Sequence, residues 1–309
     1  MNKVKKYHGV VVPMMTAFGE KHAIDADATE RLVNHVISSG AFPFLCGTTG
    51  ESASIPRAAK RSLVEAAVRA ATGKSTVYAG ISGNSLYDVI EDARSYHDLG
   101  ADVFVATMAS YYPVDNDEIQ RFFIEMADEL PGPLIIYNIP ATTHLSIPLE
   151  LVDLLSRHPN IVGFKDSERG MERLEMAVSL WKDREDFSFL TGWAASSNAA
   201  MQLGADGVVP STGNLAPYLY QVICDAVSTG DILLAEKAQK KVDRISELYQ
   251  KDKILSRGLP VFKAMLSAYG LCQSHMMPPM YPLGAAEEDA VKNLVLAQFG
   301  DLNQINSID

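Results

Sequence analysis

The sequence predicts an α/β protein: a (β/α)₈ barrel followed by a C-terminal helical extension. The first observation is that short apolar runs alternate with amphipathic helical patterns eight times before residue 231, in a length that suits a barrel of about 250 residues. The second is that a doubly wound sheet usually has fewer strands, and no Gly-x-Gly-x-x-Gly follows the first strand here. The third is that strand patterns stop after residue 231, where only helical patterns remain.

The eight predicted strands are short apolar runs, as expected for a parallel sheet that is buried on both faces. They cover residues 9–13, 42–45, 76–80, 103–106, 134–137, 161–165, 187–191 and 207–210.

The predicted helices follow these strands in turn. The first eight begin near residues 27, 56, 85, 116, 147, 168, 195 and 217, and three more cover 231–250, 258–269 and 287–298. Asp25 or Asp27 is a candidate N-cap, Pro56 suits a first helical turn, and Gly100 suits a left-handed C-cap. We expect residues 1–230 to form the catalytic barrel and residues 231–309 to form a helical extension that packs on it.

Composition and charge exclude several classes of partner. The 27 basic and 38 acidic residues give a formal charge of −11 without basic blocks, which argues against nucleic acid and anionic membranes. The basic cluster near the N-terminus precedes no apolar signal region, and no stretch approaches the length of a membrane span. Three widely spaced cysteines indicate a reducing cytoplasm, and seven single histidines without ligand spacing predict no metal site.

Lys165 is the principal candidate for catalysis, because it closes an apolar strand. Burial lowers the pKa of a lysine, and the neutral amine that results can attack a carbonyl carbon and form a Schiff base. Taken alone, the segment fits a solvent-exposed lysine better. Other polar residues also follow predicted strands, however, and the carboxyl ends of barrel strands meet on one catalytic face. These residues are Thr48, Thr49, Tyr111, Tyr112, Tyr137 and Ser211.

The segment from Gly47 to Glu51, Gly-Thr-Thr-Gly-Glu, suits the binding of a small carboxylate. Its glycines let the backbone approach a ligand, and its hydroxyls donate hydrogen bonds without adding charge. A tight strand-to-helix turn explains the same residues equally well. Tyr137 can relay a proton to Thr48 or Thr49, although a buried structural tyrosine is the simpler interpretation of that position alone. Cys46 is placed to line the pocket but has no neighbouring histidine to make it a nucleophile, and Glu51 and Asp166 receive no proton-transfer role.

Four motifs in this order resemble the dihydrodipicolinate synthase / N-acetylneuraminate lyase family of pyruvate-dependent class I aldolases. They are Gly-Thr-Thr-Gly-Glu at 47–51, Tyr-Tyr-Pro at 111–113, Tyr-Asn-Ile-Pro at 137–140 and Gly-Phe-Lys-Asp-Ser at 163–167. The resemblance implies a TIM barrel that assembles as a dimer or tetramer. It also implies that Lys165 forms an imine with pyruvate, that Thr48 and Thr49 hold the carboxylate, and that Tyr137 moves the proton. Tyr112 matches a tyrosine that the family lends across a dimer interface.

Two departures from the family pattern concern the substrate. The position where dihydrodipicolinate synthases carry a carboxylate-binding arginine is Thr142, and a hydroxyl cannot replace that charged grip. The acidic pair that sialic acid lyases present after the seventh strand is also missing, and Trp193 stands there instead. Thr143 and His144 are candidates to replace the lost polar contacts.

The resemblance therefore implies a lyase that joins or cleaves pyruvate and an aldehyde, with a 2-keto-3-deoxy sugar acid as the expected substrate. The alternatives are dihydrodipicolinate synthase with a relocated carboxylate grip, N-acetylneuraminate lyase, a dehydratase that uses the same imine, and a non-catalytic barrel that binds a 2-oxo acid. We expect no cofactor beyond the covalent lysine imine. The partners expected are a small 2-oxo acid and further copies of the chain, in the cytoplasm.

Overall fold

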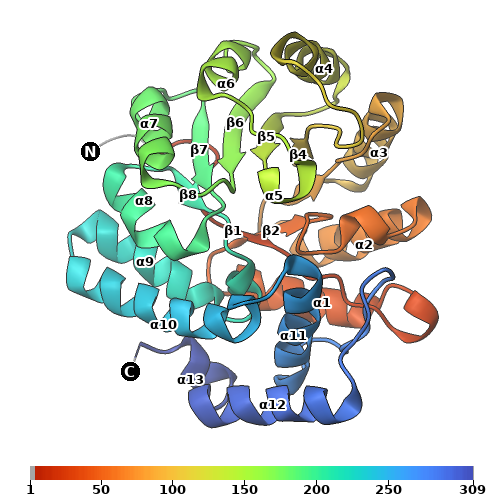
Figure 1. Cartoon of the computed structure of the whole chain (residues 1–309), viewed down its shortest axis with the longest axis vertical. Coiled ribbons are helices and arrows are strands. Elements are labelled where there is room, and N and C mark those ends of the chain that lie inside the picture. Colours follow the sequence, from red (N-terminus) through yellow and green to blue (C-terminus); the bar gives the residue numbers. More distant parts are fainter. Residues whose placement is uncertain (1–3, 309) are drawn as a thin grey trace.

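The protein is a closed barrel of eight parallel strands surrounded by helices, with further helices at the C-terminus (Figure 1). The structure is a computed structural model and describes residues 4–308. The strands follow one another around the barrel in chain order, so each pairs with its neighbours in the sequence and β8 pairs with β1. They are β1 (Gly9–Pro13), β2 (Phe42–Leu45), β3 (Tyr78–Gly80), β4 (Val103–Thr107), β5 (Leu134–Asn138), β6 (Ile161–Asp166), β7 (Ser188–Thr191) and β8 (Gly207–Val208). The predicted fold class is confirmed, with all eight strands where the apolar runs indicated.

The inside of the barrel is filled by one set of side chains, and the layer between strands and helices by another. The interior set includes Val11, Phe44, Val105, Ile135 and Tyr137. Because strand side chains alternate between the two faces, the intervening residues face outward and join the larger core beneath the helices. Tyr137 therefore points into the barrel.

The register of the sheet determines which polar side chains become neighbours. Tyr137 of β5 pairs with Lys165 of β6, and Thr107 of β4 pairs with Tyr137 on the other side. Paired residues of parallel strands project to the same face. The sheet itself thus brings the lysine and the phenol of the predicted site together.

The helices that follow the strands match the amphipathic patterns. They are α1 (Ala26–Ile37), α2 (Arg57–Ala71), α3 (Leu86–Leu99), α4 (Asn116–Glu129), α6 (Leu149–Leu155), α7 (Met171–Trp181), α8 (Ser197–Leu203) and α9 (Pro217–Thr229). Asp25 is the N-cap of α1, and Gly100 ends α3 with a φ of 104°. Pro56 precedes α2 as its N-cap residue and does not lie in the first turn. The short α5 (Pro140–Thr143) was not predicted from the sequence.

Helix α7 begins three residues later than the pattern at 168 indicates. Glu168 instead donates its backbone N–H to the Asp166 carboxylate, and Gly170 has a φ of 143°, which is incompatible with a helix. Residues 167–170 are therefore part of the loop above the barrel and cannot continue α7.

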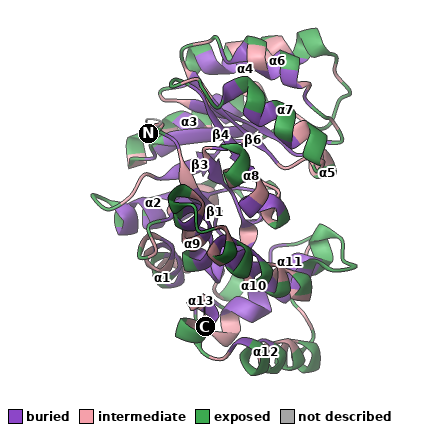
Figure 2. Cartoon of the chain, turned by 90° about the vertical axis from the view of Figure 1, so that its left-hand side faces the viewer, coloured by how far each residue is buried: buried purple, intermediate pink, exposed green. Residues whose placement is uncertain are grey.

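The C-terminal helices lie together on one side of the barrel (Figures 1 and 2). They are α10 (Ile232–Gln250), α11 (Leu255–Ala268), α12 (Ala285–Phe299) and α13 (Leu302–Asn306), the last of which was not predicted. α10 packs along α9, and α11 packs between α10 and α12. A Cβ atom on Gly258 would lie 2.4 Å from the Tyr249 carbonyl oxygen, so this glycine permits the close approach of α11 to α10. Within residues 4–308, no helix has the length and hydropathy that a membrane span requires.

Candidate active site

Lys165 lies at the carboxyl end of β6, buried inside the mouth of the barrel and only 4% exposed. Its Nζ atom lies 3.5 Å from the centroid of the Tyr137 ring and 5.0 Å from that of Phe44. Burial lowers the pKa of Lys165, and the adjacent Tyr137 opposes that shift. The arrangement therefore favours a neutral amine beside a phenol.

Tyr137 places its ring against Lys165 and also lines the cavity above the barrel. Its hydroxyl lies 3.5 Å from the Ser167 hydroxyl, at the outer limit of a hydrogen bond. The ring is packed, and the hydroxyl contacts the Ser167 hydroxyl and the Lys165 amine beside the cavity, where a substrate bound to the lysine would meet it.

The Gly-Thr-Thr-Gly-Glu segment forms a tight turn at the end of β2. The Gly50 N–H donates to the Gly47 carbonyl, and the Glu51 N–H donates to the Thr48 carbonyl. The Thr16 hydroxyl, in the segment after β1, holds the turn by donating to the Gly50 carbonyl at 2.6 Å. A Cβ atom on Gly50 would come within 2.7 Å of the Met14 carbonyl oxygen, so only glycine fits there.

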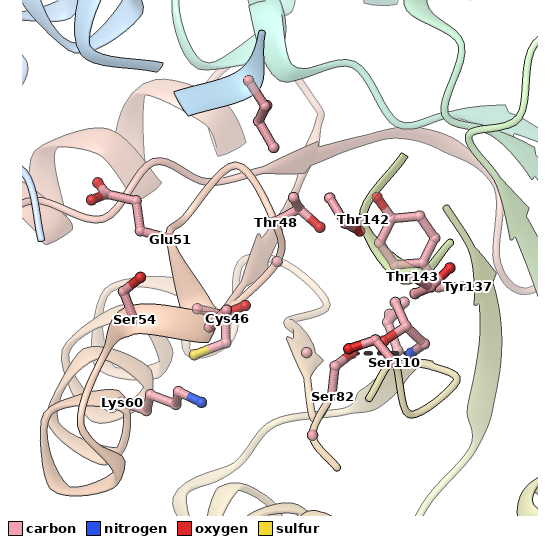
Figure 3. A pocket seen from close by; sticks show the side chains of 18 of the residues that line it. Cys46, Thr48, Glu51, Ser54, Lys60, Ser82, Ser110, Tyr137, Thr142 and Thr143 are labelled. Atoms are coloured by element: carbon pink, nitrogen blue, oxygen red, sulfur yellow. Dashed lines mark hydrogen bonds between the residues drawn. The ribbon is translucent and has the colours of Figure 1, made fainter. Parts of the chain in front are cut away.

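A cavity of about 420 Å³ opens at this end of the barrel. Thr48, Thr142, Thr143 and Tyr137 line one side of it, as Figure 3 shows. Cys46, Ser54 and Lys60 lie on the other side, and Ser82 and Ser110 lie below Thr143. Asn84 also lines the cavity. The cavity wall thus combines hydroxyls with one lysine, and no arginine lines it among the described residues.

Five predicted site residues do not line this cavity: Lys165, Thr49, Trp193, Ser211 and Tyr112. Lys165 is buried against the ring of Tyr137, which does line it. Thr49 is buried, and Trp193 lies on the loop after β7, where its backbone N–H donates to the Thr191 hydroxyl. The Ser211 hydroxyl is hydrogen-bonded to the Tyr249 hydroxyl of α10 at 2.7 Å. Tyr112 is 74% exposed and packs edge-to-face against Tyr111, outside the cavity of its own chain.

Thr142 and Thr143 do line the cavity, in the short helix α5 after β5. The Thr143 hydroxyl donates to backbone carbonyls of its own loop, at Ile139 and Leu145. His144 follows with a left-handed φ of 57°, is exposed and does not line the cavity. The two threonines are therefore the polar residues that α5 presents to a ligand.

Asp166, directly after Lys165, organises the loops around it. Its carboxylate accepts hydrogen bonds from Asn138 at 2.8 Å, from Arg173 at 2.7 Å and from the Glu168 N–H at 3.0 Å. Burial raises the pKa of Asp166, while Arg173 pulls it back down. Arg173 also donates to the Ile147 carbonyl. The carboxylate therefore links the loops after β5 and β6 and has no free position for proton transfer.

Cys46 lines the cavity as expected. Burial is the main reason that the pKa of its thiol rises to about 12, which keeps it protonated and poorly nucleophilic. Within the part of the chain that the structure describes, no group of three or more histidine, cysteine or acidic side chains could hold a metal ion.

Ser82, Asn84, Ser110 and Lys60 were missed by the sequence reasoning. The Thr107 N–H donates to the Ser82 hydroxyl at 3.0 Å, and the Ser110 N–H donates to the Asn84 side-chain oxygen at 2.9 Å. Ser82, Asn84 and Ser110 follow β3 and β4, so the strand-end rule that selected Tyr137 could have found them. Lys60 is on α2, where nothing in the sequence distinguishes it from a surface lysine.

Comparison with known proteins gives consistent matches over the whole barrel. The profile of the "Dihydrodipicolinate synthetase family" matches residues 6–298. A 4-hydroxy-tetrahydrodipicolinate synthase of Xanthomonas campestris is 31% identical over 93% of this chain and 93% of its own length. The same enzyme of Halorhodospira halophila is 29% identical over 94% of this chain and 97% of its own length.

Solved structures of related proteins superimpose closely. Dihydrodipicolinate synthase from Bacteroides thetaiotaomicron has a TM-score of 0.90 at 27% identity, covering 96% of this chain and all of the other. YagE of Escherichia coli K12, solved with pyruvate, has a TM-score of 0.88 at 25% identity, covering 94% of this chain and 98% of the other.

Proposed function

This chain belongs to the dihydrodipicolinate synthetase family. We propose that it is an aldolase that acts on a 2-keto-3-deoxy sugar acid, and that Lys165 forms a Schiff base with the pyruvoyl part of this substrate. The predicted reaction class, a pyruvate-dependent lyase, is that of the family. The observation that supports the assignment of the lysine is its burial at the mouth of the barrel, with Nζ 3.5 Å from the Tyr137 ring centroid.

The proposed reaction begins when the neutral Lys165 amine attacks the C2 ketone. The Tyr137 phenol donates the proton with which the carbinolamine oxygen leaves as water, which gives an iminium ion and the Tyr137 phenolate. Tyr137 then takes the proton of the C4 hydroxyl as the C3–C4 bond breaks. The electron pair of that bond moves into the iminium and forms an enamine, while the aldehyde departs. Tyr137 returns the proton to C3, and water hydrolyses the iminium to pyruvate and free lysine. In this scheme Thr48 and Thr49 orient the substrate carboxylate, and no cofactor is proposed.

The cavity wall supports a polyhydroxylated substrate. Beyond Tyr137 it presents the hydroxyls of Thr142, Thr143, Ser82 and Ser110, which can exchange hydrogen bonds with sugar hydroxyls. Trp193 and Ser211 do not line this cavity, and the proposal gives them no direct contact with the acceptor.

Trapping the imine tests the assignment of Lys165. Treatment with pyruvate and cyanoborohydride should add one pyruvate-derived group, and peptide mapping should place it on Lys165. The Lys165→Met variant should gain no mass. An adduct on Lys60 or Lys263, or none on the wild-type protein, would contradict the proposal.

The substrate class is tested with a panel of 2-keto-3-deoxy acids, with release of pyruvate as the readout. We expect turnover of at least one member and no pyruvate release by the Lys165→Met variant. If pyruvate forms the adduct while every member of the panel is left intact, the imine chemistry would stand and the proposed substrate class would not.

A second candidate is 4-hydroxy-tetrahydrodipicolinate synthase, the name carried by the sequence relatives described above. That activity needs a cation for the second carboxylate, and Lys60 is the lysine that lines the cavity beside the hydroxyls. The assay is condensation of pyruvate with aspartate semialdehyde. Fast condensation by the wild-type protein, weakened in the Lys60→Gln variant, would favour this function over the sugar-acid aldolase.

The proposed assembly is a homodimer or tetramer in the cytoplasm. Tyr111 and Tyr112 support this proposal. Their side chains are adjacent and about three-quarters exposed, and such an aromatic surface is unusual for a monomer.

A further inference from the structure

A fully buried ion pair joins the Gly-Thr-Thr-Gly-Glu turn to the C-terminal helices. The Lys263 ammonium of α11 donates to Glu51 Oε1, and both side chains have no solvent exposure. Lys263 also donates to the His275 carbonyl oxygen at 2.8 Å. Glu51 Oε2 accepts the Met277 N–H at 2.8 Å. Each carboxylate oxygen of Glu51 therefore has a partner from the C-terminal extension.

The turn that Glu51 ends has an unfavourable backbone conformation. Cys46 and Glu51, on either side of Gly47–Gly50, have φ values of 55° and 61°, in the left-handed region that side chains other than glycine disfavour. Both residues therefore hold the turn in a strained conformation. The turn needs a contact that holds it in place. The ion pair supplies this contact at Glu51, two residues after Thr49.

We infer that Lys263 is a positioning residue for the carboxylate-binding threonines, so that the C-terminal extension is a working part of the active site and more than an attached domain. Lys263 lies 212 residues along the chain from Glu51 and does not line the cavity itself. It acts through Glu51 on Thr48 and Thr49. This inference rests on the proposed function, because it assumes that these threonines bind the substrate carboxylate.

The chain provides a matched control. Lys5 is likewise a nearly buried lysine, with its ammonium 2.9 Å from Asp206 Oδ2 and further hydrogen bonds to the Trp181 and Phe187 carbonyls. Asp206 directly precedes β8, so this pair lies at the amino ends of the strands, opposite the cavity. Loss of Lys5 removes a buried cation without touching the threonine turn.

The kinetic experiment compares Lys263→Met, Glu51→Gln and Lys5→Met with the wild-type protein. We expect the pyruvate KM, or the pyruvate concentration that half-saturates adduct formation, to rise about tenfold or more in Lys263→Met, because misplaced donors lose charge-assisted hydrogen bonds to the carboxylate. The trapping rate at saturating pyruvate should change much less, because the threonines hold the pyruvate carboxylate equally well in the ground state and in the transition state. Glu51→Gln keeps the acceptor for Met277 and should give an intermediate value, while Lys5→Met should stay within about twofold.

A purely structural role for Lys263 predicts a different result. The thermal midpoint would then fall in Lys263→Met and Lys5→Met alike, with the wild-type KM in the protein that remains folded. That outcome would overturn the inference. If Lys263→Met does not fold, Glu51→Gln carries the same comparison, and a wild-type KM in that variant is equally decisive.

Hydrogen exchange tests the positioning without any reaction. Amide exchange over residues 47–52 should accelerate at least tenfold in Lys263→Met relative to the wild-type protein, and should stay unchanged in Lys5→Met. Unchanged exchange in both variants would overturn the inference even if the protein proved to be no aldolase. Absence of a pyruvate adduct on the wild-type protein would instead refute the proposed function.

Discussion

At the residue scale, the chemistry depends on how burial changes one amine. Lys165 follows Phe164 on a strand with no room for solvent, and its charged form loses hydration that a cation–π contact with Tyr137 only partly replaces. The neighbouring Asp166 is turned away toward Asn138 and Arg173, so it does not stabilise the ammonium as an ion pair would. Adjacent residues of one strand thus serve opposite purposes, because they project to opposite faces of the sheet.

The lowered pKa of Lys165 predicts the pH dependence of imine formation. The reactive amine is the deprotonated form, so the rate of trapping should rise with pH and then reach a plateau. The midpoint of the rise should lie below the ordinary lysine pKa of 10.5. The same shift implies that stability rises with pH between the folded-state pKa and 10.5, because there the unfolded chain binds the proton more tightly. A pH series of cyanoborohydride trapping measures the midpoint, and a value at or above 10.5 would show that the amine is not desolvated.

Tyr137→Phe should separate imine formation from bond cleavage. Loss of the phenol removes a general acid–base group, so kcat should fall about 10²–10⁴-fold, while pyruvate still forms an adduct on Lys165. Tyr78→Phe is the control, because Tyr78 is an equally buried tyrosine of the barrel interior that begins β3 and does not line the cavity. Equal losses in both variants would point to disturbed packing and not to proton transfer.

At the element scale, the loops above the barrel are fixed by charged hydrogen bonds. Asp166 collects donors from β5, from the loop before α7 and from α7 itself. Glu51 does the same between the β2 turn and α11. The strands bring the reactive side chains to one end of the barrel, and these two carboxylates set the loops between them.

Arg173→Leu tests the Asp166 anchor. Removing the cation leaves a buried carboxylate unpaired, which should cost about 3–5 kcal/mol in the free energy of unfolding near neutral pH. The loss should shrink as the pH falls from about 8 to about 5, because the already raised pKa of Asp166 rises further and the folded protein takes up the proton more readily. Urea unfolding at both pH values measures this.

The control for that experiment is Arg94→Leu. Arg94 pairs with Glu129 at 2.6 Å, but both side chains are 56% exposed. The Arg94→Leu substitution should lower the free energy of unfolding by only about 0–1 kcal/mol at either pH. A similar cost in the two variants would mean that Arg173 contributes no more than a surface charge.

At the scale of the whole molecule, the exposed Tyr111 and Tyr112 lie outside the cavity but directly follow Ser110, which lines it. Asn84 accepts hydrogen bonds from the N–H groups of Ser110 and Tyr111, which ties the tyrosine loop to the cavity rim. A second chain that covers Tyr111 and Tyr112 would therefore also reach the loops around the substrate.

We expect the mass in solution to be a multiple of 33.6 kDa, and Tyr112→Ala to weaken both assembly and turnover. Light scattering after gel filtration and the pyruvate-release assay measure the two effects. Tyr281→Ala, which removes another tyrosine with high exposure, should alter neither. A fully active monomer of the wild-type chain would refute the proposed assembly.

The barrel and the place of Lys165 at the end of a strand could be read from local patterns in the sequence. Apolar runs of strand length mark buried strands, and Lys165 is conspicuous because an ionisable side chain ends such a run. These are local properties that the chain carries whatever its neighbours are. The site residues Thr48 and Tyr137 could be proposed in the same way, because each lies at the end of a predicted strand. Thr142 was proposed only from the resemblance to the family.

Which of these residues share a surface depends on the folded arrangement of the loops and helices. Register and loop geometry place Thr142 on the cavity wall, turn Ser211 toward Tyr249 and bring Lys60 in from a helix. The link between Glu51 and Lys263 was equally unreadable, because a contact across 212 residues depends on how the C-terminal helices pack and leaves no periodic trace in either segment. Distance along the chain carries no information about such pairs, whereas burial and charge make their energetic effect large.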